Sequence, residues 1–300
     1  MTDGASTGCL VMAYGTPAGP GDVEAYYTHI RRGRPPEPEQ LRELAGRYEA
    51  IGGVSPLRRI TDAQVAAIAG ALGKGWQVTA GFKHAAPFVE DGVGELASLG
   101  VARIVGVVLA PHFSRGSVGE YGARMEEAAA AHGLAATLVT SWHDLPAWLD
   151  FQAAAVGQGL AALPDRTKVL FTAHSLPERV LVDDPYPDQL RDSATAIAAR
   201  AGLARWAGWS IAWQSAGRTA DAWRGPDVLE VIDDLAGTGR ADGVLVCPQG
   251  FAADHLEVLY DLDVEAARRA GDRGLAFART RSLNADVPVL TALADRVRAA

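Results

Sequence analysis

Two short segments of the chain contain side chains that could move protons or hold a metal ion. Residues 171–177 read Phe-Thr-Ala-His-Ser-Leu-Pro, and residues 254–261 read Asp-His-Leu-Glu-Val-Leu-Tyr-Asp. Each segment follows an apolar run typical of a buried parallel strand, and α/β proteins bind their ligands at the carboxyl ends of such strands. We therefore expect the imidazole of His174, as a base, and the carboxylate of Glu257 to face one crevice.

His174 also has a purely structural interpretation, because a histidine at a strand end often only satisfies a local hydrogen bond. The turn that follows favours a functional role instead. Pro177 ends the strand abruptly and Ser175 can cap the next segment, which would hold the imidazole at the crevice and out of the core.

Acidic residues recur at helical spacing in the second segment. Four carboxylates lie three, four and four positions apart within residues 254–270, which predict a helix: Asp254, Glu257, Asp261 and Glu265. At about 100° per residue they fall on one stripe. The stripe could be an ordinary solvated face. Its apolar neighbours and its place directly after a strand favour oxygen ligands that bind a hydrated divalent cation weakly and pass it inward.

Eight apolar runs, separated by stretches of helical periodicity, predict the strands that position these residues. In chain order the runs are residues 9–13, 77–82, 104–110, 136–140, 169–173, 209–213, 243–247 and 275–280. Such alternation is typical of repeated βαβ units. We therefore expect an α/β protein with two Rossmann-like domains, each built on a four-stranded parallel sheet flanked by helices.

The two halves of the chain resemble each other. Residues 10–17 align with residues 170–177 at an offset of 160 positions (170 minus 10), which makes Tyr14 and His174 equivalent. An ancient duplication explains this match better than chance does.

The same pattern predicts where the domains lie. We expect an N-terminal domain of residues 1–142 and a C-terminal domain of residues 143–300, because residues 144–146 read as the start of a helix. The Gly- and Pro-rich segments 26–38 and 51–56 are expected to form an extended lip over a cleft. A cleft between two such domains is a natural ligand site.

The composition excludes several classes of protein. A net charge of −8 over 300 residues disfavours nucleic acid and anionic membranes as main partners. We expect a soluble protein without membrane insertion, because no segment approaches roughly 18 uncharged apolar residues. Cys9 and Cys247 are the only cysteines, which favours a reducing cytoplasm over a disulfide framework. The signatures of dinucleotide, P-loop and H-E-x-x-H zinc sites are absent.

Five further segments, in order along the chain, carry a resemblance to a known family. They are residues 11–17 (Val-Met-Ala-Tyr-Gly-Thr-Pro), 26–33 (Tyr-Tyr-Thr-His-Ile-Arg-Arg-Gly), 47–57 (Arg-Tyr-Glu-Ala-Ile-Gly-Gly-Val-Ser-Pro-Leu), 81–84 (Gly-Phe-Lys-His) and 110–114 (Ala-Pro-His-Phe-Ser). With the two segments quoted first, they run through nearly all of the chain. The chain resembles the ferrochelatases, and among them the soluble coproporphyrin type of Gram-positive bacteria.

The resemblance implies insertion of Fe²⁺ into coproporphyrin III to give coproheme, a step of heme biosynthesis. His174 and Glu257 match the family's catalytic pair, and which of the two takes the proton or binds the metal stays open. Asp261 and Glu265 resemble an outer pair on the metal's path, which makes the implied metal ligands His174, Glu257, Asp261 and Glu265. The matching porphyrin-binding positions are Tyr14, Tyr27, Arg31, Arg32, Ser55, His84 and Trp223. Five of them also have a structural alternative: Tyr14 and Trp223 as packed rings, Arg31 and Arg32 as exposed charges, and His84 as a hydrogen-bonded histidine.

Two other functions fit the same residues. One is a chelatase for another tetrapyrrole or metal, such as protoporphyrin or sirohydrochlorin with Zn²⁺ or Co²⁺, and the other is a non-catalytic carrier of a tetrapyrrole or metal. Retention of both His174 and Glu257 favours an enzyme, because a carrier needs no proton acceptor. We expect no permanently bound cofactor: Fe²⁺ is substrate, and two cysteines cannot hold the [2Fe-2S] cluster of some members. We expect a monomer, and by family analogy a coproheme decarboxylase is the expected recipient of the product.

Overall fold

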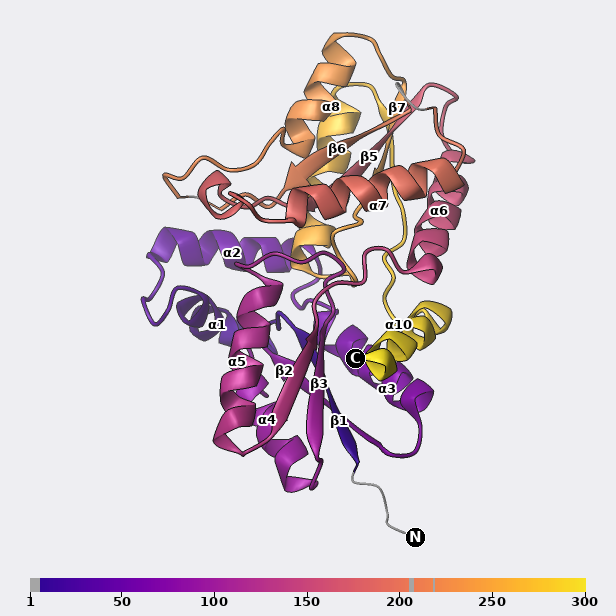
Figure 1. Ribbon diagram of the computed structural model, residues 1–300. Helices are drawn as coiled ribbons and strands as arrows, with labels where there is room; N and C mark the ends of the chain where they lie inside the picture. Colours follow the sequence, from indigo (N-terminus) through magenta and orange to yellow (C-terminus); the bar gives the residue numbers. More distant parts are fainter. Residues whose placement is uncertain (1–5, 205–207, 218) are drawn as a thin grey trace.

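The protein's structure, a computed structural model, describes residues 6–204, 208–217 and 219–300. It contains two four-stranded parallel sheets, one in each half of the chain (Figure 1). The first has the order β2-β1-β3-β4, with β1 (Thr7–Ala13), β2 (Trp76–Phe82), β3 (Arg103–Val108) and β4 (Ala135–Val139). The second has the order β6-β5-β7-β8, with β5 (Thr167–His174), β6 (Trp209–Gln214), β7 (Gly243–Cys247) and β8 (Ala276–Arg279). Each predicted strand overlaps an observed one, so the predicted fold is confirmed.

Helices flank both sheets. The α-helices are α1 (Val23–Ile30), α2 (Pro38–Ala50), α3 (Leu57–Leu72), α4 (Val89–Ser98), α5 (Val118–Ala131), α6 (Pro146–Leu160), α7 (Tyr186–Arg200), α8 (Val228–Gly237), α9 (Ala267–Asp272) and α10 (Val287–Ala299). Short 3₁₀ turns occupy η1 (Pro20–Asp22) and η2 (Glu178–Val180), and η3 (Val258–Ala266) is a π-helix.

The two sheets share one strand order, which agrees with the internal repeat. β1 and β5 are the equivalent inner strands, each paired with the next strand of the chain on one side and with the one after that on the other. In each sheet the chain therefore continues first to one side of the inner strand and then to the other. In α/β proteins, ligands bind at the carboxyl ends of the strands where the strand order reverses in this way. Tyr14 follows β1 directly, and His174 ends β5.

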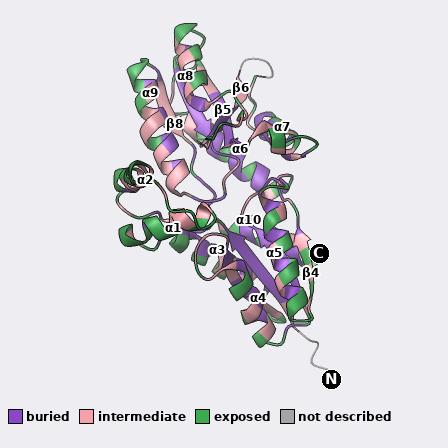
Figure 2. Cartoon of the chain, turned by 90° about the vertical axis from the view of Figure 1, so that its left-hand side faces the viewer, coloured by how far each residue is buried: buried purple, intermediate pink, exposed green. Residues whose placement is uncertain are grey.

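One hydrophobic core runs through both halves. It joins Val11 of β1 with Phe171 of β5, both fully buried, and it includes Trp142 and Trp148 at the junction. The two indoles meet edge to face with ring centroids 5.3 Å apart, an arrangement that aromatic pairs prefer. In Figure 2 the inner strands of the sheets are mostly buried, whereas the outer turns of the surrounding helices are exposed.

Helix α10 returns from the end of the chain to the first half, where it packs against α3 (Figure 1). Arg296 of α10 also forms an ion pair with Asp144, at 2.6 Å. The domain boundary between residues 142 and 143 stays a prediction. Helix α10 belongs to the second half of the sequence but packs against the first half.

The expectation of an extended lip over residues 26–38 was wrong at both ends of the segment, which are helical. Residues up to Ile30 belong to α1, and α2 begins at Pro38. Proline fits the first turn of a helix because its missing N–H would have no partner there. The side chain of Gln40 accepts a hydrogen bond from the backbone N–H of Glu37 at 3.0 Å and completes the cap.

The loop after β3 binds helix α7 of the other half. His112 is 3% exposed, and its Nε2 lies 2.8 Å from Oγ of Ser193. The backbone N–H of Phe113 donates to the side chain of Gln189 at 2.7 Å. These contacts fix the first half against α7, the helix that follows the His174 strand.

Because His112 is buried, the protein should lose stability in mild acid. Burial, and then the charge of nearby His143, hold the pKa of His112 well below its usual value. The histidine therefore binds a proton more readily in the unfolded chain than in the folded one. Its contribution to the free energy of unfolding is complete above about pH 6.5, and it is lost as the pH falls, at up to about 1.4 kcal/mol per pH unit. We expect His112→Asn to lose less stability than the wild type between pH 7 and pH 5, by urea unfolding. Equal losses would contradict this account.

Candidate active site

His174 and Glu257 lie together, as the sequence predicted. His174 is the last residue of β5, and Glu257 immediately precedes the π-helix η3. Nε2 of His174 lies 3.5 Å from Oε1 of Glu257, and the side chains are 34% and 35% exposed. The pair is therefore held by protein on one side and accessible to a ligand on the other.

The two groups shift each other's protonation. Burial works to lower the pKa of His174, but the Glu257 carboxylate, the Ser175 carbonyl and the charge of Asp261 outweigh it and raise that pKa. Burial works to raise the pKa of Glu257, but His174 and His255 outweigh it and hold that pKa below its usual range. Glu257 is thus a carboxylate that makes the imidazole a stronger base.

His255 is a third member of the site that the sequence reasoning missed. Its Nε2 lies 3.4 Å from Oε2 of Glu257, and its Nδ1 lies 3.0 Å from the carbonyl oxygen of Ala253. In a regular helix, residues two positions apart do not face each other. His255 reaches Glu257 because the helix begins only at Leu256. A histidine in the same short segment was the available signal.

The predicted helix over residues 254–270 was wrong at its start and in its type. Asp254 precedes the helix, and its carboxylate accepts hydrogen bonds from Ser282 at 2.7 Å and from Asn284 at 2.9 Å. It also pairs with Arg279 at 3.1 Å. Asp254 therefore anchors a loop and does not extend the acidic stripe. The helix that follows is a π-helix, a rare form that is frequent at functional sites.

Asp261 lies inside this π-helix and is 7% exposed. It accepts a hydrogen bond from the hydroxyl of Ser215, and Arg47 of α2 lies 3.7 Å away. Burial and the charge of Glu257 raise the pKa of Asp261 to about 6, although Ser215 and Arg47 act to lower it. Glu265, one turn further on, is half-buried.

The structure does not gather the predicted metal ligands into one cage. Within residues 6–204, 208–217 and 219–300, no group of three or more His, Cys, Asp or Glu side chains is arranged to hold a metal ion. Asp261 and Glu265 lie on the π-helix that begins directly after Glu257. This arrangement fits the predicted path for an ion, and the ligand roles themselves stay predictions.

Tyr14 and His84 come from the ends of β1 and β2. Tyr14 is 43% exposed, and its ring centroid lies 4.6 Å from that of His84. Desolvation and then the charge of Glu257 raise the pKa of Tyr14, so this tyrosine of the first half lies within the field of the second-half pair. Nδ1 of His84 lies 3.0 Å from Nδ1 of His29. Burial, Lys83 and His29 lower the pKa of His84 to about 3, so its imidazole is neutral near pH 7.

The predicted basic residues lie at the end of α1. Arg31 stacks over the ring of Tyr27, with its guanidinium carbon 5.7 Å from the ring centroid. Arg32 is exposed, and both arginines line a hollow of about 250 Å³ together with Ile30 and Arg34. A planar guanidinium suits carboxylates, which it binds through two hydrogen bonds.

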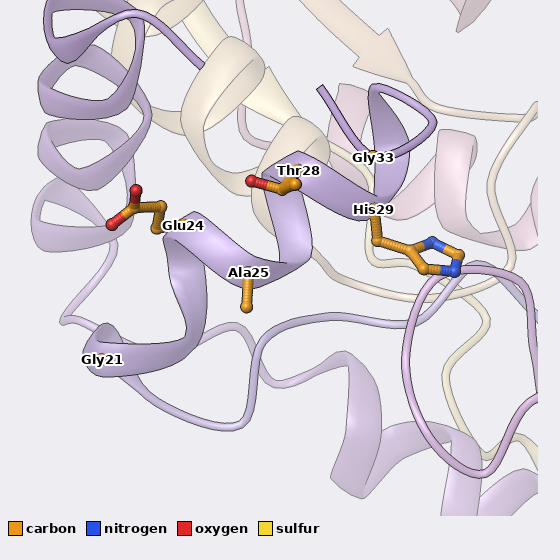
Figure 3. Close-up of a pocket in the computed structure, with 6 residues that line it drawn as sticks. All are labelled: Gly21, Glu24, Ala25, Thr28, His29 and Gly33. Carbon is orange, nitrogen blue, oxygen red and sulfur yellow. The ribbon is translucent and has the colours of Figure 1, made fainter. Parts of the chain in front are cut away.

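A second hollow, of about 590 Å³, lies on α1 and is lined by Gly21, Glu24, Ala25, Thr28, His29 and Gly33. In Figure 3 the side chains of Glu24 and His29 point in opposite directions. They do not converge on a common ligand.

Ser55 and Trp223 have local partners. Ser55 is 4% exposed, and its hydroxyl accepts a hydrogen bond from the backbone N–H of Leu57 at 3.3 Å, where α3 begins. The indole of Trp223 donates to Thr219 at 3.1 Å, and its backbone pairs with that of Pro177, three residues after His174. Ser55 thus supports a helix start, and Trp223 lies half-buried on a loop beside the His174 turn. Porphyrin binding by either stays a prediction.

A family model described as Ferrochelatase matches residues 6–300. The chain belongs to the ferrochelatase family. Two curated members are named coproporphyrin III ferrochelatase: one from Bacillus subtilis (strain 168) is 44% identical, and one from Bacillus pumilus (strain SAFR-032) is 43% identical. Each alignment covers 97% of this chain and 96% of the relative.

Solved chelatase structures share the fold of this ferrochelatase-family chain. SirB from Bacillus subtilis with Fe³⁺ gives a TM-score of 0.59 at 13% identity, covering 98% of this chain and 94% of that one. CbiX, described as the terminal enzyme of siroheme biosynthesis in denitrifying bacteria, gives 0.57 at 15% identity, covering 96% and 98%. At such low identity these likenesses establish the chelatase fold alone.

Membership of the ferrochelatase family makes the chain an enzyme, a lyase of heme biosynthesis. None of the helices in the described part of the chain combines the length and the apolar character that a membrane crossing requires.

Proposed function

We propose that the chain inserts Fe²⁺ into coproporphyrin III and releases coproheme. The observation that carries this proposal is the His174–Glu257 pair at the end of β5, with Nε2 and Oε1 3.5 Å apart and each side chain about one-third exposed. The relatives from Bacillus subtilis and Bacillus pumilus, which bear the name coproporphyrin III ferrochelatase, support the choice of substrate.

The reaction places two demands on the site. Two pyrrole N–H protons must leave the macrocycle as Fe²⁺ enters it, and the cation must exchange its water for nitrogen ligands. An imidazole made more basic by Glu257 can accept the two protons one after the other and pass each to solvent, because the His174 side chain is 34% exposed, and the imidazolium formed each time is stabilised by the same carboxylate. Asp261 and Glu265 then supply oxygen ligands along which the cation reaches His174.

The substrate's carboxylates need cationic partners. Coproporphyrin III carries four propionates, and Arg31 and Arg32 at the end of α1 offer guanidinium groups for them. The ring of Tyr14, 43% exposed beside neutral His84, provides a surface for the macrocycle. Tyr27, Ser55 and Trp223 complete the proposed porphyrin site.

We also propose that the chain works without a resident cofactor. Cys9 and Cys247 lie in different sheets, and burial raises the pKa of each thiol to about 12, which disfavours the thiolates that a [2Fe-2S] cluster needs. We further propose a cytoplasmic monomer that passes coproheme to a decarboxylase. Analytical ultracentrifugation of the purified protein tests the monomer.

The purified protein should metalate coproporphyrin III faster than protoporphyrin IX. The physical reason is that coproporphyrin III presents twice as many propionates to the arginines at the end of α1. Anaerobic absorbance spectroscopy with Fe²⁺ and either porphyrin follows the loss of the free-base bands. Faster conversion of protoporphyrin IX would overturn the substrate assignment, and binding of both porphyrins without conversion would favour a carrier.

A further inference from the structure

The imidazole of His174 takes its direction from the main chain beside it. Its Nδ1 lies within hydrogen-bond distance of the carbonyl oxygen of Ser175, the very next residue. In the usual case Nδ1 donates to a carbonyl, which leaves Nε2 directed at the catalytic partner. Any rotation of the backbone between His174 and Ser175 therefore turns Nε2 relative to Glu257.

The peptide group between His174 and Ser175 is held on both sides. The hydroxyl of Tyr186 donates to the carbonyl oxygen of His174 at 3.3 Å. The N–H of Ser175 donates to the carbonyl of Gln214 at 2.8 Å. Pairing of β5 with β7 ends at Phe171, so the Tyr186 hydroxyl takes the place of a strand neighbour for this carbonyl.

Tyr186 is itself fixed by the first half of the chain. It is 8% exposed and begins α7. Its backbone N–H donates to Oδ1 of Asp184 at 3.0 Å, and the backbone N–H of Arg115 donates to Oδ2 of the same carboxylate at 2.8 Å. Asp184 is 7% exposed, so one buried carboxylate joins the loop after β3 to the tyrosine that holds His174.

The internal repeat contains a related contact. Tyr26 and Tyr186 are 160 positions apart (186 minus 26), the interval that also separates Tyr14 from His174 (174 minus 14). The hydroxyl of Tyr26 donates to the carbonyl oxygen of Gly15 at 3.1 Å, directly after β1. Gly15 aligns with Ser175 (15 plus 160), so each tyrosine holds a backbone carbonyl at the end of its strand, but the carbonyl in the first half is one residue further along.

We propose that Tyr186 is a positioning residue for His174, and that Asp184 couples it to the loop after β3. The inference rests on the proposed function, because it assigns Tyr186 a role through the base of that reaction. The proposed porphyrin site draws residues from both halves, so this link keeps the His174 imidazole in register with the half that carries Arg31 and Arg32.

The test is Tyr186→Phe, which removes one hydroxyl and keeps the ring. We expect kcat for Fe²⁺ insertion to fall about tenfold while KM for the porphyrin changes less than twofold, because a misdirected base slows the chemical step and not binding. In the free protein, the downfield proton resonance of His174 Nδ1–H should broaden or vanish, since its hydrogen bond to Ser175 is loosened. His174→Ala assigns that resonance. Tyr26→Phe, the matched change at the other strand end, should leave it in place.

An unchanged Nδ1–H resonance together with kcat within twofold of the wild type would overturn the proposal. Asp184→Asn is the second variant: it should weaken the same resonance, and it decides the question if Tyr186→Phe does not fold. The resonance is measured without substrate. Failure of the wild type to metalate porphyrin would therefore refute the proposed function, whereas the Nδ1–H resonance would still show whether Tyr186 orients His174.

Discussion

Replacing His174 by alanine is expected to lower kcat for metal insertion by roughly 10²- to 10⁴-fold, the range for a lost general base. Nε2 of His174 lies 3.5 Å from Glu257, and the Glu257 charge raises the pKa of the imidazole. Alanine removes this base and leaves Arg31, Arg32 and Tyr14 in place. Porphyrin binding should therefore remain measurable by fluorescence titration while conversion nearly stops.

The matched control is His132→Ala. His132 is an exposed histidine at the C-terminal end of α5, so its loss should leave kcat within twofold of the wild type. Added imidazole should restore part of the lost activity to His174→Ala, because the variant leaves space for the free base. Normal turnover by a folded His174→Ala protein would show that this imidazole is not the base.

The strands and the central pair were predictable because their signals are local. Apolar runs of strand length recur with helical stretches between them, and that pattern identifies repeated βαβ units. The carboxyl ends of parallel strands meet at one edge, which places a residue such as His174 at a ligand site as soon as its strand is found. The separation of His174 from Glu257 in sequence is therefore no obstacle to predicting their proximity.

The π-helix was not predictable by the same reasoning. Its sequence has the spacing of an ordinary helix, and the choice of i→i+5 hydrogen bonds depends on tertiary contacts. One such contact is the hydrogen bond that the hydroxyl of Ser215 donates to Asp261. Ser215 directly follows β6. Asp254 lies outside the helix and not on the predicted acidic stripe, because Arg279, Ser282 and Asn284 bind its carboxylate. None of these three residues is near Asp254 in sequence.

The roles of His255 and Tyr186 were also not predictable from local sequence spacing. His255 lies two positions from Glu257, a spacing that helical reasoning rejects, and only the late start of the helix brings the two together. Tyr186 contacts the backbone of His174 and not its side chain. Sequence patterns predict which residue types could react, whereas the groups that orient them depend on where the backbone turns.

Glu257→Gln is the second large effect, with an expected fall in kcat of roughly 10²-fold. Glutamine keeps the size of the side chain but removes the negative charge that stabilises a protonated His174 and the incoming cation. Asp263→Asn is the matched control: it removes one carboxylate from the same π-helix, but Asp263 is exposed and pairs with Arg279 at 2.7 Å. Its kcat should stay within about threefold of the wild type, in the anaerobic Fe²⁺ insertion assay.

The pH profile of kcat/KM distinguishes this role from a merely structural one, because it reports the pKa of the free enzyme. The Glu257 carboxylate raises the pKa of His174 above its usual value, so a neutral His174, and with it kcat/KM, should appear only as the pH rises through that raised pKa. In Glu257→Gln the pKa falls, and the rising limb of the profile moves to lower pH. The activity lost in Glu257→Gln should then be largest in alkali, where His174 of the wild type is fully neutral. Near neutral pH the loss should be smaller, because His174 is mostly deprotonated in the variant but still mostly protonated in the wild type. A deficit of the same size at every pH would mean that Glu257 supports the site's shape and does not tune its base.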